Sequence, residues 1–159
     1  MSVASGEITY FLDTSALVKL YHQEQGSEVV ERWAADQTIE IWLSDLTRAE
    51  LHSAFVRKVR EGGLTEADLQ RVLTCFREDL QNRFQIVPLT GDTVEKAALL
   101  LLDQGKRHSL RTLDALQIAS AQAVGSNDLT FATADGKLFT VASELFSRVI
   151  NPEDVESSQ

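Results

Sequence analysis

The chain has 159 residues and a formal net charge of −9, and 43% of its residues are hydrophobic. A chain of this length is expected to form one domain, because it can bury roughly two thirds of its unfolded surface. No apolar stretch approaches the roughly 20 residues of a membrane span, and no basic-then-apolar leader opens the chain. Cys75 is the only cysteine, which excludes an internal disulfide, and its helical apolar setting predicts a buried thiol. We expect a cytoplasmic protein without a membrane partner.

Strand-like and helix-like patterns alternate from one end of the chain to the other. In chain order we expect a strand at 9–12, a helix carrying Ala16, Leu17, Leu20 and Tyr21, a helix at 27–35, a strand at 39–43, a helix at 46–60, a helix beginning at 65, a strand at 84–89, a helix at 92–103, a helix at 113–124, a strand at 129–133, a helix at 137–145 and a strand at 148–150. Short apolar strands separated by helices predict an α/β fold with a parallel sheet covered on both faces.

Three segments carry further expectations about organisation. Pro88 predicts that its strand lies at a sheet edge or ends there. The charged segment 57–83 is expected to form a solvated helical hairpin that protrudes from the sheet layer. We assign residues 1–150 to one domain and residues 151–159 to a polar, frayed C-terminal tail.

Four acidic residues occupy equivalent places in this alternating pattern. Asp13 closes the first strand, Glu50 and Asp114 lie at the starts of helices, and Asp135 follows the fourth strand. In a parallel sheet, the carboxyl ends of strands and the helix starts that follow them lie along one edge. Open α/β sheets bind their ligands at that edge. The pattern therefore predicts that the four carboxylates share one site.

Each acid also has a structural explanation as part of a helix start. Asp13 could cap the first helix, Glu50 could form a capping box with Thr47, and Asp135 could cap the last helix. Asp114 lies in a first helical turn, where a negative charge suits the helix dipole, and Arg111 could be its partner. Taken singly, each acid favours this explanation. The four acids taken together do not favour it, because helix capping does not require a carboxylate at every one of the four positions.

Four neighbouring carboxylates with few fixed cations beside them would repel one another unless a divalent metal neutralised them. Hard oxygen ligands without cysteine or histidine clustering favour Mg²⁺ or Mn²⁺ over zinc. The net charge of −9 argues against a nucleic-acid partner, because phosphate binding usually draws on a basic surface. Two bound divalent ions would cancel the four carboxylates, however, so overall charge does not decide the partner.

Other catalytic chemistries find little support in the sequence. The three histidines sit in polar surroundings and are expected at the surface: His22, His52 and His108. There is no nucleophile-elbow sequence, and no glycine-rich phosphate loop follows the first strand. A basic segment precedes the Asp114 helix, and within it Arg107 and Arg111 are candidate contacts for RNA phosphates. Alone, this segment is typical of a solvated basic loop.

Four sequence blocks resemble a known family. They are YFLDTSALVKLYHQEQGSE around Asp13, LSDLTRAELHSAF around Glu50, LRTLDALQIASA around Asp114 and FATADGKLF around Asp135. In this order, and over nearly the whole chain, they are similar to the PIN domain, and most closely to the toxin nucleases of VapBC-type toxin–antitoxin pairs.

The resemblance implies a three-layer, Rossmann-like α/β/α fold with a central parallel sheet of about four to five strands. It implies a metal-dependent endoribonuclease that acts on single-stranded or loop RNA and leaves a 5′-phosphate. Asp13 and Asp114 would be the principal ligands of Mg²⁺ or Mn²⁺, Glu50 would orient water, and Asp135 would act through a second metal or bound waters. Two residues are expected to support them through hydrogen bonds, Ser15 and Thr133. A homodimer and a VapB-like antitoxin that blocks the acidic site are also implied.

Three alternative functions have different requirements. A receiver-like phosphoacceptor domain would need an aspartate at the end of a central strand and a lysine after the last one; the strand at 84–89 instead runs into Thr90-Gly91, and Arg148 precedes the last strand. A PIN nuclease outside toxin–antitoxin systems would share the same four acids. A catalytically inactive PIN scaffold for protein binding also remains open.

Overall fold

Strands and helices alternate along the computed structural model, which describes residues 8–155. The strands are β1 (Ile8–Leu12), β2 (Ile39–Ser44), β3 (Phe84–Val87), β4 (Thr130–Ala132) and β5 (Arg148–Ile150). The helices are α1 (Thr14–Leu17), the 3-10 helix η1 (Val18–Leu20), α2 (Ser27–Ala35), α3 (Leu46–Arg60), α4 (Glu66–Asn82), α5 (Gly91–Gln104), α6 (Thr112–Ala123) and α7 (Gly136–Leu145). The predicted elements are confirmed, with most boundaries shifted by at most two residues.

The strands of residues 8–155 form one parallel sheet in the order β3-β2-β1-β4-β5. The chain builds outward from β1 through β2 to β3, then returns to the other side of β1 with β4 and β5. The strand order therefore reverses between β1 and β4. At such a point the crevice outside the carboxyl ends of the strands is the usual ligand site of an open α/β sheet. The predicted α/β fold class is confirmed.

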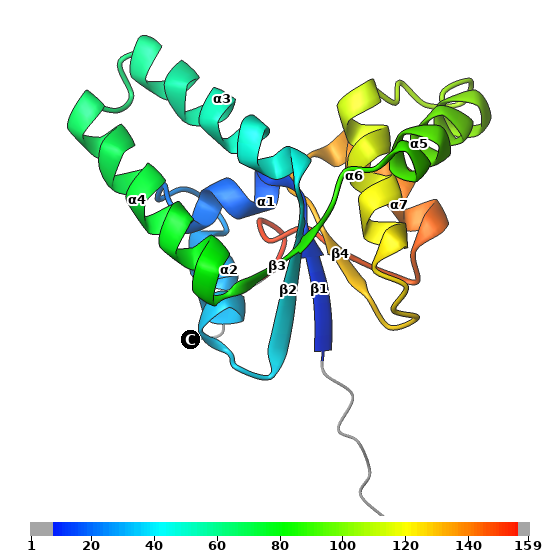
Figure 1. The fold of residues 1–159 in the computed structure, drawn as a ribbon, viewed down its shortest axis with the longest axis horizontal. Helices are drawn as coiled ribbons and strands as arrows, with labels where there is room; N and C mark the ends of the chain where they lie inside the picture. The colour runs from blue at the N-terminus through cyan, green and yellow to red at the C-terminus, as the bar shows by residue number, and fades with distance from the viewer. Residues whose placement is uncertain (1–7, 156–159) are drawn as a thin grey trace, which may run out of the picture.

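Helices cover both faces of this sheet, which gives the three predicted layers (Figure 1). Because successive side chains of a strand point to opposite faces, Leu12 enters one core and Phe11 the other. The core on the Leu12 face includes Phe55 and Phe76 from α3 and α4, and the core on the Phe11 face includes Ile118 from α6. α5 packs on the outer side of α6 through small alanine side chains. Within residues 8–155 no helix is both long and apolar enough to cross a membrane.

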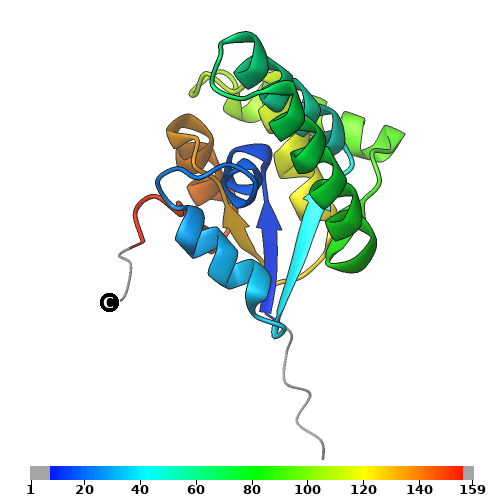
Figure 2. The same ribbon diagram turned by 90° about the vertical axis from the view of Figure 1, so that its left-hand side faces the viewer.

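α3 and α4 form the predicted helical hairpin, whose connecting end projects beyond the sheet (Figure 1). Gly62 follows α3 with a φ of 81°, which only glycine adopts at little cost, and lets the chain turn back. The hairpin is less solvated than expected, because Val72 and Phe76 of α4 are buried in the core. Figure 2 shows α2 and α4 over this face of the sheet, with strands visible between the two helices. The prediction of a buried Cys75 is wrong: its thiol is exposed, since Val72 and Phe76 already form the inward stripe.

The expectation of a frayed tail is also wrong for residues 151–155. Pro152 is buried, and Glu153 pairs with Lys19 at 2.6 Å. The backbone of Pro152 approaches Gly26 so closely that a Cβ there would lie 2.9 Å from the Pro152 carbonyl. This segment therefore docks on the loop between η1 and α2. Residues 156–159 lie outside the described part of the chain.

Candidate active site

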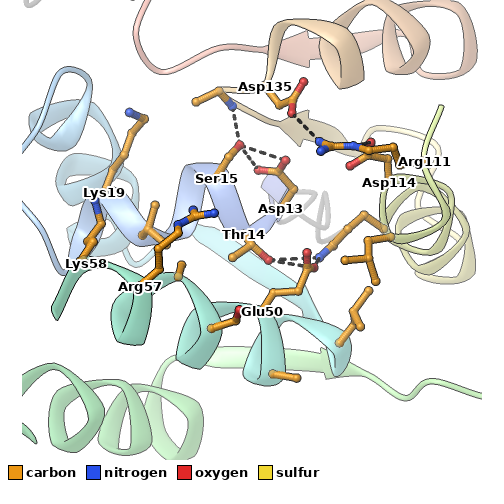
Figure 3. A pocket seen from close by; sticks show the side chains of 18 of the residues that line it. Asp13, Thr14, Ser15, Lys19, Glu50, Arg57, Lys58, Arg111, Asp114 and Asp135 are labelled. Atoms are coloured by element: carbon orange, nitrogen blue, oxygen red, sulfur yellow. Dashed lines mark hydrogen bonds and ion pairs between the residues drawn. The ribbon is translucent and has the colours of Figure 1, made fainter. Parts of the chain in front are cut away.

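The four predicted acids line one cleft of about 950 Å³ at the carboxyl edge of the sheet (Figure 3). Asp13 follows β1, Glu50 lies one turn into α3, Asp114 lies in the first turn of α6, and Asp135 precedes α7. They are separated by up to 122 residues in sequence and meet because β1 and β4 are neighbours and because α3 and α6 begin at the same edge. The cleft lies beside the reversal of strand order.

Asp13 is the most buried of the four, with 4% of its surface exposed. The Ala16 amide donates to Oδ1 at 2.9 Å, which makes Asp13 the N-cap of α1 as its structural explanation required. Thr133 Oγ1 donates to Oδ2 at 2.7 Å, and Ser15 Oγ lies 2.7 Å from Oδ1. Ser15 also accepts a hydrogen bond from the Ala134 amide. Ser15 and Thr133 are thus placed where the sequence predicted hydrogen-bonding support.

Burial raises the pKa of Asp13 to about 6, against a usual value near 4. The hydrogen bonds from Thr133, Ala16 and Ser15 act in the opposite direction, and the nearby Glu50 carboxylate raises the pKa further. The partners of Asp13 named here are neutral. A buried carboxylate in this setting is a good ligand for a cation, since a cation would replace the hydration that burial removes.

Glu50 is held by neutral side chains as well. Thr14 Oγ1 donates to its Oε1 at 3.0 Å, and Gln117 Nε2 donates to the same oxygen at 2.6 Å. The predicted capping box between Thr47 and Glu50 is wrong, because α3 begins at Leu46 and Thr47 lies inside the helix. The Thr47 hydroxyl instead accepts from Gln117 at 3.1 Å. Glu50 is therefore oriented toward the cleft and not toward its own helix start.

Arg111 connects the other two acids, as Figure 3 shows. Its Nε donates to Asp114 at 3.2 Å and one terminal nitrogen donates to Asp135 at 3.4 Å. Asp135 also caps α7 by accepting from the Lys137 amide at 2.9 Å. The sequence predicted few fixed cations beside the acids. This prediction needs correction, because Arg111 partly neutralises the charges of Asp114 and Asp135. The guanidinium is 72% exposed, so it is held only from one side.

Three further basic residues line the cleft, and the sequence reading did not single them out: Lys19, Arg57 and Lys58. Lys19 is only 2% exposed and is occupied by Glu24 at 3.1 Å, Glu153 at 2.6 Å and the Gln25 carbonyl at 2.8 Å. Arg107 does not line this cleft; its guanidinium pairs with Glu144 at 3.2 Å. Of the two predicted phosphate contacts, the structure therefore brings only Arg111 to the acids.

A family model for the PIN domain matches residues 10–144. This chain belongs to the PIN domain family. Among curated proteins it is 35% identical to ribonuclease VapC49 of Mycobacterium tuberculosis over 144 residues, which are 89% of this chain and 94% of that protein.

Solved structures support the same PIN fold. VapC20 of Mycobacterium tuberculosis, a toxin that cleaves the sarcin–ricin loop, aligns with a TM-score of 0.64 and 18% identity over 86% of this chain and 95% of its own. A toxin–antitoxin complex from Klebsiella pneumoniae aligns with a TM-score of 0.58 and 20% identity over 92% and 99%. The resemblance drawn from the four sequence blocks is confirmed.

The acids of this PIN domain fit a hard divalent cation in their chemistry, although they are not gathered around one point. Within residues 8–155 no three acidic, histidine or cysteine side chains are grouped closely enough to hold a metal ion. The donor set is nevertheless all oxygen, which Mg²⁺ and Mn²⁺ prefer. Gln117 turns its Nε2 toward Glu50, and its buried Oε1 has no hydrogen-bond partner. Arg111 occupies the space between Asp114 and Asp135 and can withdraw toward solvent.

Gln117 and Thr14 hold Glu50 in the cleft and were not predicted from the sequence, although signals for both were present. Gln117 follows Asp114 by three residues, a spacing that puts two helical side chains on one face. Thr14 follows Asp13 directly. Arg57 follows Glu50 by seven residues, which is two helical turns along the same face. None of the three histidines lines the cleft. His52 is exposed as predicted, whereas His22 and His108 are half-buried.

Proposed function

We propose that this PIN domain is a divalent-metal-dependent endoribonuclease that hydrolyses phosphodiester bonds in single-stranded or loop RNA. We further propose that it is the toxin of a type II toxin–antitoxin pair. The observation that carries the proposal is the meeting of Asp13, Glu50, Asp114 and Asp135 in one cleft. The identity of 35% to a ribonuclease over nearly the whole chain supports the same reaction.

Asp13 and Asp114 are the proposed principal ligands of Mg²⁺ or Mn²⁺, with Glu50 and Asp135 completing the site. When bound, the metal would neutralise charge on the scissile phosphate and lower the pKa of a coordinated water. Thr133 and Ser15 fix the Asp13 carboxylate, and the hydrogen bonds of the site thus prepare its oxygens before substrate arrives.

Glu50 is the proposed residue that orients the attacking water and accepts its proton. Thr14 and Gln117 both donate to Glu50 Oε1, which leaves Oε2 available for this role. In the reaction, the water oxygen bonds to phosphorus, the bond from phosphorus to the 3′ oxygen breaks, and that oxygen takes up a proton. The products are a 5′-phosphate and a 3′-hydroxyl. Arg111 would contact the RNA phosphate once it leaves Asp135.

The biochemical test uses purified protein and a mixed pool of single-stranded RNA, with Mg²⁺, with Mn²⁺ or with chelator. Cleavage is expected from the unmodified chain with either metal, and from neither Asp13→Asn nor Asp114→Asn. Equal cleavage by the two Asn variants would overturn the site assignment. If no condition gave cleavage, the inactive PIN scaffold would be the better description.

The toxin proposal needs a separate test in living cells. Expression of the unmodified chain in bacteria is expected to arrest growth, and Asp13→Asn is expected to remove the arrest. Normal growth with soluble, RNA-cleaving protein would favour a PIN nuclease outside toxin–antitoxin systems. A VapB-like antitoxin and a homodimer remain part of the proposal; sedimentation of the purified chain tests the dimer, and relief of growth arrest by a neighbouring gene tests the antitoxin.

A further inference from the structure

One face of α3 continues the cleft away from the acids. The cleft-lining residues of this helix recur every three or four positions, so they form a single stripe, which comprises Leu46, Ala49, Glu50, Ser53, Ala54, Arg57 and Lys58. Glu50 lies toward one end of the stripe and Lys58 at the other.

The geometry of the stripe suits an extended chain. Arg57 follows Glu50 by seven residues, which is about 10 Å along the helix at 1.5 Å per residue and nearly the same direction around it. Ser53 and Ala54 lie between Glu50 and Arg57 on this face. Their small side chains leave space in the cleft above the helix. The helix thus presents a carboxylate, a small-residue stretch and then two cations in a line.

Arg57 differs from the other basic residues of the cleft in lacking an acidic partner. Arg111 is bound to Asp114 and Asp135, and Lys19 is enclosed by two glutamates. Among the described residues, no ion pair or hydrogen bond engages the Arg57 side chain, which is exposed. Lys58 has only a distant contact, 3.9 Å from Glu24. Figure 3 shows Arg57 and Lys58 on the opposite side of Asp13 from Arg111.

We infer that the α3 stripe from Glu50 to Lys58 is the path of one flank of a single-stranded RNA, with Arg57 contacting a backbone phosphate a few nucleotides from the cut and Lys58 supporting it. The inference rests on the proposed function, because it places the scissile phosphate at the acids. A strand cut there must continue on both sides, and the cleft carries a cation on each side: Arg111 on one, Arg57 on the other. The phosphates along a flexible strand can therefore contact Arg111 on one side of the acids and Arg57 on the other.

The binding test uses fluorescence anisotropy with a single-stranded RNA of about ten nucleotides. Cleavage is prevented by working in an Asp13→Asn background with Mg²⁺ present. Arg57→Gln is expected to weaken binding about two- to fivefold, as for a solvent-exposed ion pair. The slope of log affinity against log salt should become less steep by about 0.7. Arg77→Gln is the matched control, because Arg77 is an exposed arginine of the same hairpin that does not line the cleft.

A second measurement locates the contact on the strand. With otherwise unmodified protein, cleavage of a labelled RNA is compared with cleavage of versions shortened on one side of the cut. The defect of Arg57→Gln is expected to vanish when one particular flank is removed and to persist when the other is removed. A defect equal to that of Arg77→Gln, or unaffected by either truncation, would overturn the inference.

The outcomes separate this inference from the proposed function. If the unmodified chain cleaves RNA and Arg57→Gln changes neither binding nor cleavage, the path along α3 is overturned and the proposed nuclease function is retained. Arg57-dependent binding without cleavage supports the path and refutes the nuclease. A chain that neither binds nor cleaves RNA overturns both, and the free cations would then be better explained by an acidic protein segment.

Discussion

Gln117 Nε2 donates a 2.6 Å hydrogen bond to Glu50 Oε1, and this contact joins α6 to α3 across the cleft. The same amide nitrogen lies 3.1 Å from the Thr47 hydroxyl and 3.3 Å from the Thr14 hydroxyl. An ionised Glu50 requires the NH₂ group to face it, because the amide oxygen would repel the carboxylate. Gln117 is 3% exposed, so its position is fixed by packing. We conclude that Gln117 positions Glu50.

Replacing Gln117 should therefore lower activity through Glu50. Gln117→Leu keeps a similar volume and removes the donor, so kcat for RNA cleavage is expected to fall roughly 10- to 100-fold with little change in KM. Gln122→Leu is the matched control, because Gln122 is exposed on the same helix. A kcat for Gln117→Leu equal to that of the control would show that Glu50 does not depend on this contact.

The buried Asp13 should make stability fall as the pH rises. Its pKa is about 6 in the folded protein and near 4 in the unfolded chain, so the folded state binds more protons between these values. The free energy of unfolding then decreases from about pH 4 to about pH 6. Asp13→Asn has no proton to lose and should be more stable above pH 6, by at most roughly 3 kcal/mol.

Urea unfolding in the presence of chelator measures this difference across the pH range. The two proteins should have equal stability below about pH 4 and diverge toward pH 6. Added Mg²⁺ should then stabilise the unmodified chain more than Asp13→Asn, because ligand binding stabilises only the state that binds it. Parallel stability curves for the two proteins from pH 4 to pH 7 would contradict the burial argument.

Arg111 should compete with a metal ion for Asp114 and Asp135. Removing its guanidinium in Arg111→Gln leaves both carboxylates without a cation, so Mn²⁺ should bind about two- to tenfold more tightly. Electron paramagnetic resonance of free Mn²⁺ measures the affinity, and added salt should narrow the difference. Arg107→Gln, which removes an arginine paired with Glu144, should leave the affinity unchanged. Weaker Mn²⁺ binding by Arg111→Gln would refute competition.

The docked tail should contribute to stability through Lys19. Glu153→Gln removes one of the two carboxylates around the buried Lys19 ammonium and should lower the free energy of unfolding by about 1–3 kcal/mol. Asp154→Asn changes the same charge at an exposed neighbour and should have little effect. Adding Lys19→Met to Glu153→Gln should cost less than the two changes summed. Equal stabilities of Glu153→Gln and Asp154→Asn would show that the Lys19–Glu153 ion pair does not contribute to stability.

The fold was predictable where its signals are local. The helices at 27–35 and 46–60 and the strand at 148–150 have the expected boundaries, because periodicity and turn residues mark them. The segment after Asp13 was harder, since the spacing of its apolar residues suits α1 followed by η1 as well as one longer helix. The docking of 151–155 was not predictable, because Lys19 supplies its partner from 134 residues away.

The candidate site was predictable as a set of acids and not as a network of contacts. The four carboxylates follow from strand ends and helix starts, and these positions are readable in the sequence. The partners of Glu50 come from α1 and α6. Their local spacings relate Thr14 to Asp13 and Gln117 to Asp114, so the sequence does not show that both contact Glu50. The predicted capping box was wrong because helix starts are uncertain by one or two residues, and α3 begins one residue before Thr47. Arg57 becomes informative only when its lack of an acidic partner is known.

The most direct test of the acidic cleft is the binding of Mg²⁺ or Mn²⁺ measured by isothermal titration calorimetry. The unmodified chain, Asp13→Asn and Asp114→Asn are titrated at neutral pH after exhaustive chelation, with Asp128→Asn as a control outside the cleft. We predict saturable binding to the unmodified and control proteins and its loss in both cleft variants. Equal binding by all four proteins, or binding by none, would contradict the assignment of these carboxylates as a metal-dependent RNA-cleaving site.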